Sequence, residues 1–327
     1  MERSLFGKAC LVTGGAGFGG SHLTEQLLAR GAKVVVLDRW LPKNSYMVLA
    51  GLLSKVDFLQ GDVRDFDFVR QALERFEIDT VFHLAAQPLV PVSNALPLET
   101  LSVNAMGTFT VLEAIRCSTQ TKRLVFASSG AYYGTTSGAA PIQEDDAPLV
   151  ATNMYAPSKA AADLAVRCYT KIYGLKAAAC RFMNTYGPGD TNFSRLVPRA
   201  AKNLIEGGDF DFGDRDDGTT VLTYMHVRDM ASAYIRTAER LEGVTGEALN
   251  FGGDLAISTR EMASLCARAF GNEARSPAFR GPPREVSLRK VLDTRKAKEL
   301  LGWKPETPLE EGLRETFAWY REFWDRL

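Results

Sequence analysis

The stretch Leu11-Val12-Thr13-Gly14-Gly15-Ala16-Gly17-Phe18-Gly19-Gly20 changes from an apolar run into glycines and then into a helical pattern. It predicts a strand, a tight turn and the start of a helix. Gly14, Gly17 and Gly20 are spaced three apart. The backbone can therefore turn at the first, approach a ligand's phosphates at the second and pack the helix on the strand at the third. The first amides of that helix would point at a pyrophosphate.

A carboxylate follows the second expected strand. After a helix that ends at Gly31, residues 32–38 form an apolar run that closes with Asp38, eighteen residues after Gly20. An acceptor for a ribose 2′-hydroxyl lies at about this spacing in dinucleotide-binding folds, and its charge would repel a 2′-phosphate. The sequence therefore favours NAD over NADP, while the cation Arg39 keeps NADP open as an alternative.

The composition describes a large chain with no charge bias. Its 327 residues, 46% of them hydrophobic, can bury a core that suits one large α/β domain with a smaller companion. The 39 basic and 39 acidic residues balance without a Lys/Arg-rich run, so nucleic acid and membrane surfaces are not expected partners. Five scattered cysteines and three histidines predict no metal site and a reducing, cytoplasmic location. No signal peptide or membrane span is expected.

Acidic and small residues follow the next two strands. A strand within residues 56–65 ends in an acidic turn, where Asp62 and Val63 could hold and cover an adenine. The apolar run at residues 80–87 breaks into small side chains, which a strand end needs if a cofactor lies across it. His83 in this run is interpreted as packed or hydrogen-bonded rather than catalytic.

The alternation of helices and strands continues through the first half of the chain. Residues 98–117 predict a long helix with apolar side chains on more than one face, which indicates deep burial or a subunit interface. Asn104 within it is expected to satisfy backbone groups of a neighbouring strand. A further buried strand within residues 123–134 ends in the hydroxyls of Ser128 and Ser129. The pattern predicts an α/β fold, a Rossmann-type doubly wound parallel sheet with ligands at the carboxyl ends of its strands.

Tyr155 and Lys159 are four residues apart at the start of another expected helix, so they share one helix face. A lysine ammonium beside a phenol would stabilise the phenolate and lower its pKa, as a general base for a sugar hydroxyl requires. Ser129 stands 26 residues before Tyr155, at the end of the preceding strand. The three side chains are therefore expected to converge over a nicotinamide.

These residues together resemble the extended short-chain dehydrogenase/reductase family, and within it the NAD-dependent epimerases and dehydratases that act on nucleotide sugars. The resemblance covers nearly the whole chain, including residues 181–189 and 293–305. It implies a cofactor site made by Gly14, Gly17, Phe18, Gly20, Asp38, Arg39, Asp62, Val63, Leu84, Ala85, Ala86, Asn104, Ser128, Tyr155 and Lys159. It implies a nucleotide-sugar site made by Gln87, Ser129, Asn184, Arg195, Arg215 and Arg284. It further implies a homodimer that pairs through the helices at 98–117 and 155–173.

The branch that the chain resembles most is that of the CDP-glucose and GDP-mannose 4,6-dehydratases, through residues 86–90, 189–190 and 195–198. Those enzymes have an acid directly after the serine or threonine, where this chain has Gly130 and Ala131. Neither residue can transfer a proton. The small pair resembles the 4-epimerases instead, which need no further acid.

A second departure is Leu222, which stands where the family usually has an arginine that grips the substrate diphosphate. Another cation must take that role. Arg284 is the first candidate, although a solvated surface position is an equally open interpretation of such an arginine. The other candidates are Arg195, Arg215, Arg228 and Arg280.

The last third is expected to hold a smaller lobe that is interleaved with the sheet. We predict an NAD-binding domain at residues 1–184, with residues 220–254 returning to it, and a substrate-binding lobe at residues 185–327. Within the last third, helices are expected at 196–205 and 259–270, a strand of the main sheet at 247–252, and an aromatic packing helix at 311–327.

The sequence thus predicts NAD-dependent C4 epimerisation of a nucleotide sugar through a 4-keto intermediate. Tyr155 would take the proton of the 4-hydroxyl, with Lys159 beside it and Ser129 relaying the proton. The alternative is a 4,6-dehydratase that takes its acid from His83, Glu144 or Asp145. A nucleotide-binding regulator without turnover is an alternative from a different class. The nucleotide and the sugar stay open.

Overall fold

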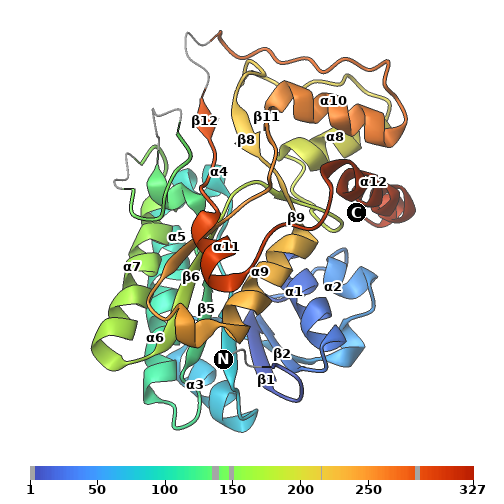
Figure 1. Cartoon of the computed structure of the whole chain (residues 1–327). Coiled ribbons are helices and arrows are strands. Elements are labelled where there is room, and N and C mark those ends of the chain that lie inside the picture. The colour runs from blue at the N-terminus through green and yellow to red at the C-terminus, as the bar shows by residue number, and fades with distance from the viewer. Residues whose placement is uncertain (1–3, 135–139, 147–150, 215, 284–287) are drawn as a thin grey trace.

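A computed structural model describes residues 4–134, 140–146, 151–214, 216–283 and 288–327. A seven-stranded sheet forms its centre, with the strand order β10-β6-β5-β4-β1-β2-β3 (Figure 1). Every neighbouring pair in this sheet is parallel. The strands are β1 (Ala9–Thr13), β2 (Lys33–Asp38), β3 (Asp57–Gln60), β4 (Thr80–His83), β5 (Arg123–Ala127), β6 (Lys176–Phe182) and β10 (Ala248–Phe251).

Helices cover both faces of this sheet, and each face has its own apolar core. One core joins the sheet to α3 (Phe66–Arg75), α6 (Gly107–Cys117) and α7 (Tyr155–Tyr173). The other joins it to α1 (Phe18–Ala29) and α9 (Val227–Glu239). Parallel strands that are buried on both faces need such crossover helices, so the predicted doubly wound Rossmann-type fold is confirmed. The helix after the glycines begins at Phe18, directly after Gly17.

The expected long helix at 98–117 is helical throughout but not uniform. It consists of α5 (Pro97–Leu101), a π-helical turn at Ser102–Met106 and α6. The short helix α4 (Val90–Ala95) precedes it. Leu98 and Met106 are 81% and 58% exposed, so this segment presents apolar side chains on the surface as well as to the core.

A smaller lobe packs above the carboxyl ends of the strands, as Figure 1 shows. Its three-stranded sheet has the order β11-β8-β12, and a further pair of short strands joins β7 to β9. These strands are β7 (Thr185–Tyr186), β8 (Val221–Thr223), β9 (Met225–His226), β11 (Ala256–Ser258) and β12 (Arg289–Lys290). The predicted helices at 196–205 and 259–270 are confirmed as α8 (Leu196–Ile205) and α10 (Thr259–Phe270).

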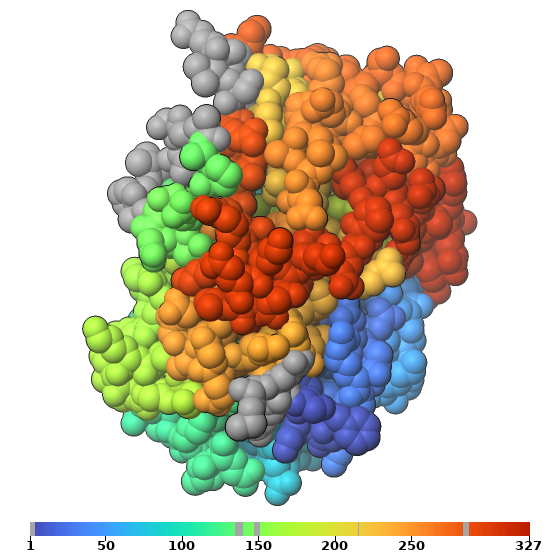
Figure 2. All heavy atoms as spheres, in the orientation of Figure 1, coloured from blue at the N-terminus to red at the C-terminus, as the bar shows by residue number. Residues whose placement is uncertain are grey.

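The C-terminal part crosses between the two lobes. The helix α11 (Arg295–Leu301) contacts β10 of the large sheet, and α12 (Leu309–Phe323) buries Leu313, Phe317 and Tyr320 in the small lobe. The expectation that the aromatic helix packs into a core is therefore confirmed. Figure 2 shows the orange-red residues after β12 covering the front of the molecule where the lobes meet.

Residues 220–254 divide between the two lobes. The strand expected at 247–252 does join the main sheet as β10, and α9 packs on α1. The strand β8, at residues 221–223, pairs with β11 and β12 in the small sheet. The division into domains itself stays a prediction.

The remaining elements are short. They are the helix α2 (Tyr46–Leu49) and the 3-10 turns Leu53–Lys55, Gly130–Tyr133, Leu241–Gly243 and Trp324–Arg326. Among the described helices, none has the length and apolar character needed to cross a membrane.

Candidate active site

The glycine turn lies at the carboxyl end of β1, against the end of β4. Gly14 has φ +70° and donates its N–H to the Leu37 carbonyl at 2.8 Å. A Cβ at Gly14 would lie 2.7 Å from the Ala85 nitrogen, and one at Gly20 would overlap the Gly14 carbonyl oxygen. Side chains at these two positions would therefore push the turn away from β4 and from α1.

The N-terminus of α1 is open towards the same edge of the sheet. Its N-cap, Gly17, has no side chain that could cap the helix. The amides of the first turn of a helix have no partner within the helix and carry the positive end of its dipole. This glycine-lined cradle therefore fits a dinucleotide pyrophosphate.

Asp38 is held at the end of β2 by two backbone amides. Its Oδ2 accepts from the Ala16 N–H at 3.0 Å, and its Oδ1 accepts from the Arg39 N–H at 2.8 Å. Burial raises the pKa of this carboxyl, and the two hydrogen bonds oppose the shift. The first of these bonds ties the carboxylate to the glycine turn, so the proposed ribose and pyrophosphate contacts belong to one rigid unit.

His83 is fully buried in β4, and both of its ring nitrogens are engaged. Nδ1 lies 2.7 Å from Thr13 Oγ1, and Nε2 lies 3.0 Å from Thr108 Oγ1. Burial, together with the charge of Lys159, lowers the histidine pKa to about 3. The interpretation of His83 as a hydrogen-bonded core residue is confirmed, and a neutral ring with both nitrogens occupied is no source of acid for a dehydratase.

Asn104 reaches from the π-helical turn to the loop that follows β4. Its Oδ1 accepts from the Gln87 N–H at 2.7 Å, and its Nδ2 donates to the Gln87 carbonyl at 3.0 Å and to Ser158 Oγ at 2.9 Å. Asn104 thus satisfies backbone groups as expected, but these groups lie in the loop after β4 and not in a strand. The Gln87 amide itself donates to the Leu89 carbonyl and to Thr100 Oγ1 within the loop.

Ser129 and Tyr155 come together at the end of β5. Tyr155 is the first residue of α7, and a hydrogen bond from Ser129 favours its phenolate. Burial nevertheless raises the pKa of Tyr155, and the charge of Arg195 opposes this rise. The amide of Ala131 donates to Ser129 Oγ at 3.1 Å, which fixes the serine.

Lys159 is buried on α7, one helical turn after Tyr155, and it contacts the end of β5. Its buried Nζ donates to the Ala127 carbonyl at 2.7 Å, and burial lowers its pKa to about 8. This contact directs the ammonium at the end of β5, and the expected effect of Lys159 on the phenol pKa stays a prediction. The groups that oppose the raised pKa of Tyr155 are Ser129 and Arg195.

A buried ion pair behind these residues was not predicted. Arg181 is fully buried and binds both carboxylate oxygens of Asp163 at 2.9 and 3.0 Å. Ser128, predicted to contact the cofactor, donates its hydroxyl to the same carboxylate at 2.6 Å. The available signal was spacing, since Asp163 follows Tyr155 by eight residues and Lys159 by four and so shares their helix face.

A cavity of about 830 Å³ lies in the small lobe and is lined by Asn184, Arg195, Phe212 and Leu222, among others. Asn184 has φ +49° and donates its amide to the Thr223 carbonyl at 3.2 Å. Arg195 forms an ion pair with the buried Asp190 at 2.9 Å. Leu222 lines the β8 side of the cavity, and the cations among the described lining residues, Arg195, Arg199 and Lys202, belong to α8 and its N-cap.

The other predicted substrate arginines do not line this cavity in the part of the chain that the structure describes. Arg228 pairs with Glu315, and Arg280 pairs with Asp211. Arg215 and Arg284 lie outside the described residues. Of the five candidates, Arg195 is the one seen in the cavity wall.

Comparison with known proteins identifies the family. A family model described as GDP-mannose 4,6 dehydratase matches residues 11–316. The chain belongs to this family of extended short-chain dehydrogenases/reductases, the NAD-dependent epimerases and dehydratases of nucleotide sugars. The expected family, and with it the expectation of an enzyme, is confirmed.

Relatives of both reaction types occur in the family. A UDP-glucose 4-epimerase of Halalkalibacterium halodurans is 33% identical over 96% of each chain. The crystal structure of a UDP-glucose 4-epimerase from Thermotoga maritima, with UDP-glucose, matches with a TM-score of 0.86 and 28% identity over 97% of this chain and 99% of that one. A dTDP-glucose 4,6-dehydratase structure from Streptomyces venezuelae with NAD bound matches with a TM-score of 0.84 and 31% identity over 96% and 97% of the two chains. The NAD in that structure agrees with the cofactor predicted from the sequence.

One feature of this family member bears on the choice between its two reactions. Gly130 follows Ser129, and a Cβ there would overlap the side chain of Met183. An acidic side chain at that position would have to displace this methionine. Of the other predicted acids, Glu144 accepts from the Asn250 N–H at 2.8 Å, and Asp145 is exposed.

Proposed function

We propose that this enzyme is an NAD-dependent 4-epimerase of a nucleotide-diphosphate sugar. The observation that carries the proposal is the end of β5, where Ser129 adjoins Tyr155 while Gly130 packs against Met183. A 4-epimerase needs to move one proton at the 4-hydroxyl. A 4,6-dehydratase also needs an acid for the 6-hydroxyl, and residues 130 and 131 supply none.

In this reaction the Tyr155 phenolate accepts the proton of the sugar 4-hydroxyl as the C4–H bond breaks. NAD, when bound, supplies the hydride acceptor and returns the hydride to C4. Ser129 donates a hydrogen bond to the same oxygen, and Lys159 holds the end of β5 through the Ala127 carbonyl. The 4-keto sugar turns over in its pocket, and Tyr155 gives the proton back to the oxygen once hydride has returned to the other face.

The diphosphate of the substrate is assigned to Arg195 and Asn184. Arg195 is half-buried at the N-cap of α8, and its pairing with Asp190 orients the guanidinium in the cavity wall. An oriented guanidinium binds phosphate oxygens through paired N–H groups. This cation takes the role that Leu222 cannot, with Arg215 and Arg284 as the remaining candidates.

The cofactor and substrate residues predicted from the sequence are part of the same proposal. So is a homodimer that pairs through α5, α6 and α7. These helices and the π-helical turn between α5 and α6 expose the apolar side chains of Leu98, Met106, Phe109, Leu164, Ile172 and Tyr173. A cytoplasmic location is supported by the five cysteines, all of which are free thiols. The proposal also includes an NAD-binding domain at residues 1–184, to which residues 220–254 return, and a substrate-binding lobe at residues 185–327.

The test is turnover of UDP-, CDP-, GDP- and dTDP-hexoses, followed by NMR. We expect a C4-inverted sugar from one of them, and a Tyr155→Phe variant that loses activity by about a thousandfold. Tyr173→Phe, on the same helix with a half-exposed ring, is the matched control and keeps its activity. A 6-deoxy-4-keto product from the wild type, or full turnover by Tyr155→Phe, would overturn the proposal.

A further inference from the structure

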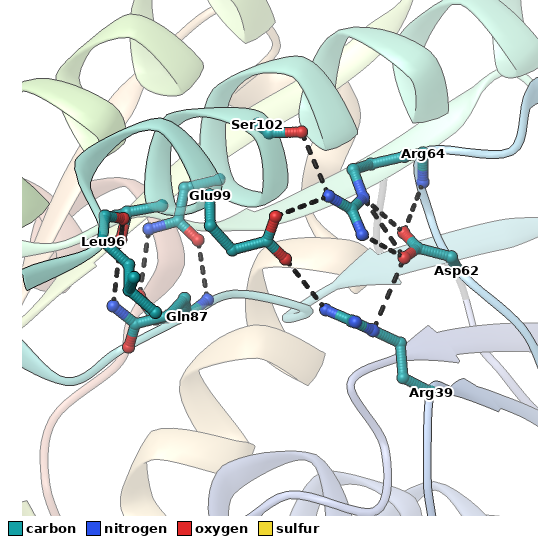
Figure 3. Close-up of polar contacts among 9 residues, drawn as sticks. Arg39, Asp62, Arg64, Gln87, Leu96, Glu99 and Ser102 are labelled. Atoms are coloured by element: carbon teal, nitrogen blue, oxygen red, sulfur yellow. Dashed lines mark hydrogen bonds and ion pairs between the residues drawn. The ribbon is translucent and has the colours of Figure 1, made fainter. Parts of the chain in front are cut away.

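Four charged side chains form a closed ionic network beside Asp38. Arg64 binds Asp62 through Nε at 3.1 Å and Nη2 at 2.7 Å, and binds Glu99 through Nη1 at 3.0 Å. Arg39 binds Glu99 through Nη1 at 3.3 Å and lies 3.5 Å from Asp62 through Nε. Figure 3 shows the two arginines and the two carboxylates alternating around the network.

The four residues come from three separate segments at one edge of the sheet. Arg39 directly follows β2, Asp62 and Arg64 follow β3, and Glu99 belongs to α5. Ser102, on the π-helical turn, also accepts from Arg64 at 3.1 Å. The helix that carries the exposed Leu98 thus supplies a carboxylate to the predicted adenosine end of the cofactor site.

Arg39 is the cation that the sequence left as an argument for NADP. An arginine close to the ribose carboxylate is the feature that accommodates a 2′-phosphate in folds of this type. Here its side chain is 45% exposed, yet its guanidinium is committed to two carboxylates. The position of Arg39 alone therefore does not make the site suitable for NADP.

Glu99 is the member of the network that holds Arg39 most closely. Asp62 is already satisfied by two nitrogens of Arg64 and by the Arg64 backbone N–H at 2.9 Å. Its contact with Arg39 is the longest in the network at 3.5 Å. Glu99 instead accepts one hydrogen bond on each oxygen, from Arg39 on Oε1 and from Arg64 on Oε2.

We propose that Glu99 is a specificity-determining residue for the cofactor, because it draws the Arg39 guanidinium away from a 2′-phosphate on the adenosine ribose. Preference for NAD then depends on two features, the carboxylate of Asp38 and the neutralisation of Arg39 by a residue 60 positions further along the chain. Without the Glu99 charge, Arg39 keeps only its longer contact to Asp62, and its guanidinium can bind the 2′-phosphate of NADP.

The test is a competition between cofactors that involves no sugar. The purified protein is equilibrated with equal concentrations of NAD+ and NADP+, freed of unbound nucleotide and denatured, and the released nucleotides are quantified by chromatography. Glu99→Gln is expected to raise the NADP:NAD ratio by about fivefold, the effect of one partly exposed ion pair. Adding Arg39→Ala to this variant should return the ratio to its wild-type value.

Asp67→Asn is the matched control, since Asp67 is a more exposed carboxylate on α3 and pairs only with Arg70 among the residues described. It should leave the ratio unchanged. A merely structural role of Glu99 would lower the binding of both cofactors and leave their ratio fixed. An unchanged or lower ratio in Glu99→Gln, or a raised ratio that survives Arg39→Ala, would overturn the inference, and neither outcome depends on which sugar the enzyme uses.

Discussion

The surroundings of Tyr155 shift the pKa of its phenol in two opposite directions. Burial raises the pKa of the phenol, while a hydrogen bond from Ser129 and the charge of Arg195 lower it. The same arginine stands in the wall of the cavity proposed for the nucleotide sugar. One cation can therefore act on both the substrate diphosphate and the proton acceptor.

Arg195→Gln is accordingly expected to change two observables together. The KM for the nucleotide sugar should rise by about tenfold, because a charge-assisted contact to phosphate is lost. Since the phenolate is the active form, the rate rises with pH through the pKa of Tyr155. Loss of the cation raises that pKa and moves this limb of the pH–rate profile to higher pH.

Lys202→Gln is the control for this prediction, because Lys202 lies on the same helix and lines the same cavity. Its charge is not among the influences on Tyr155. The limb should stay where it is in this variant. If Arg195→Gln leaves both KM and the limb unchanged, Arg195 is a surface residue and another arginine holds the diphosphate.

At the scale of elements, the turn between β1 and α1 depends on close approach rather than on specific side chains. Gly14 lies against the end of β4, and Gly20 lies against the turn itself. The periodic pattern of glycines predicted this arrangement because both contacts are local in sequence or lie between adjacent parallel strands. The same unit presents the open N-terminus of α1.

Gly20→Ala should therefore disturb the turn. The added methyl group overlaps the Gly14 carbonyl, so we expect the free energy of unfolding to fall by about 2 kcal/mol and the NAD content of the purified protein to fall with it. Gly208→Ala, where a Cβ meets nothing within 4 Å, is the control and should be neutral. Urea unfolding and nucleotide release measure both; an unaltered NAD content in Gly20→Ala would contradict the assignment of the cradle.

The apolar surface of α5, α6 and α7 makes a second prediction at this scale. Leu164→Glu places a charge on the face where Leu164 is 53% exposed, and should convert a dimer into a monomer in light scattering. Leu255→Glu, equally exposed on the small lobe, should leave the dimer intact. A wild type that is monomeric at micromolar concentration would remove the dimer from the proposal.

For the whole molecule, the features predicted from the sequence were those set by local pattern. Periodicity predicted α8 and α10 to the residue, and the βα alternation predicted the parallel sheet. Strands of two or three residues, such as β8 and β12, carry too little pattern, and they pair with partners far along the chain. The sequence therefore predicted no strand at residues 221–223 or 289–290.

In the candidate active site, too, the features with a local sequence signal were predicted and the others were not. Motif spacing brought Ser129 and Tyr155 together correctly, but the direction of the Lys159 side chain depends on the carbonyl that ends β5, and spacing does not reveal it. The pairing of Arg39 with Glu99 joins residues 60 positions apart and has no local signal. Ion pairs between distant segments of this kind can be identified only from the folded structure.

Epimerisation and dehydration differ in the fate of hydrogen at C4 and C5 of the sugar, which NMR of the product measures. A nucleotide hexose labelled with deuterium at C4 is converted by the enzyme in ordinary water, and the unlabelled sugar is converted in D2O. For a 4-epimerase we expect a C4-inverted product that keeps its deuterium at C4 and gains none from solvent at C5, because the hydride is returned within the site. A 6-deoxy product with solvent deuterium at C5 would contradict it, since that product requires the acid which Gly130 and Ala131 do not provide.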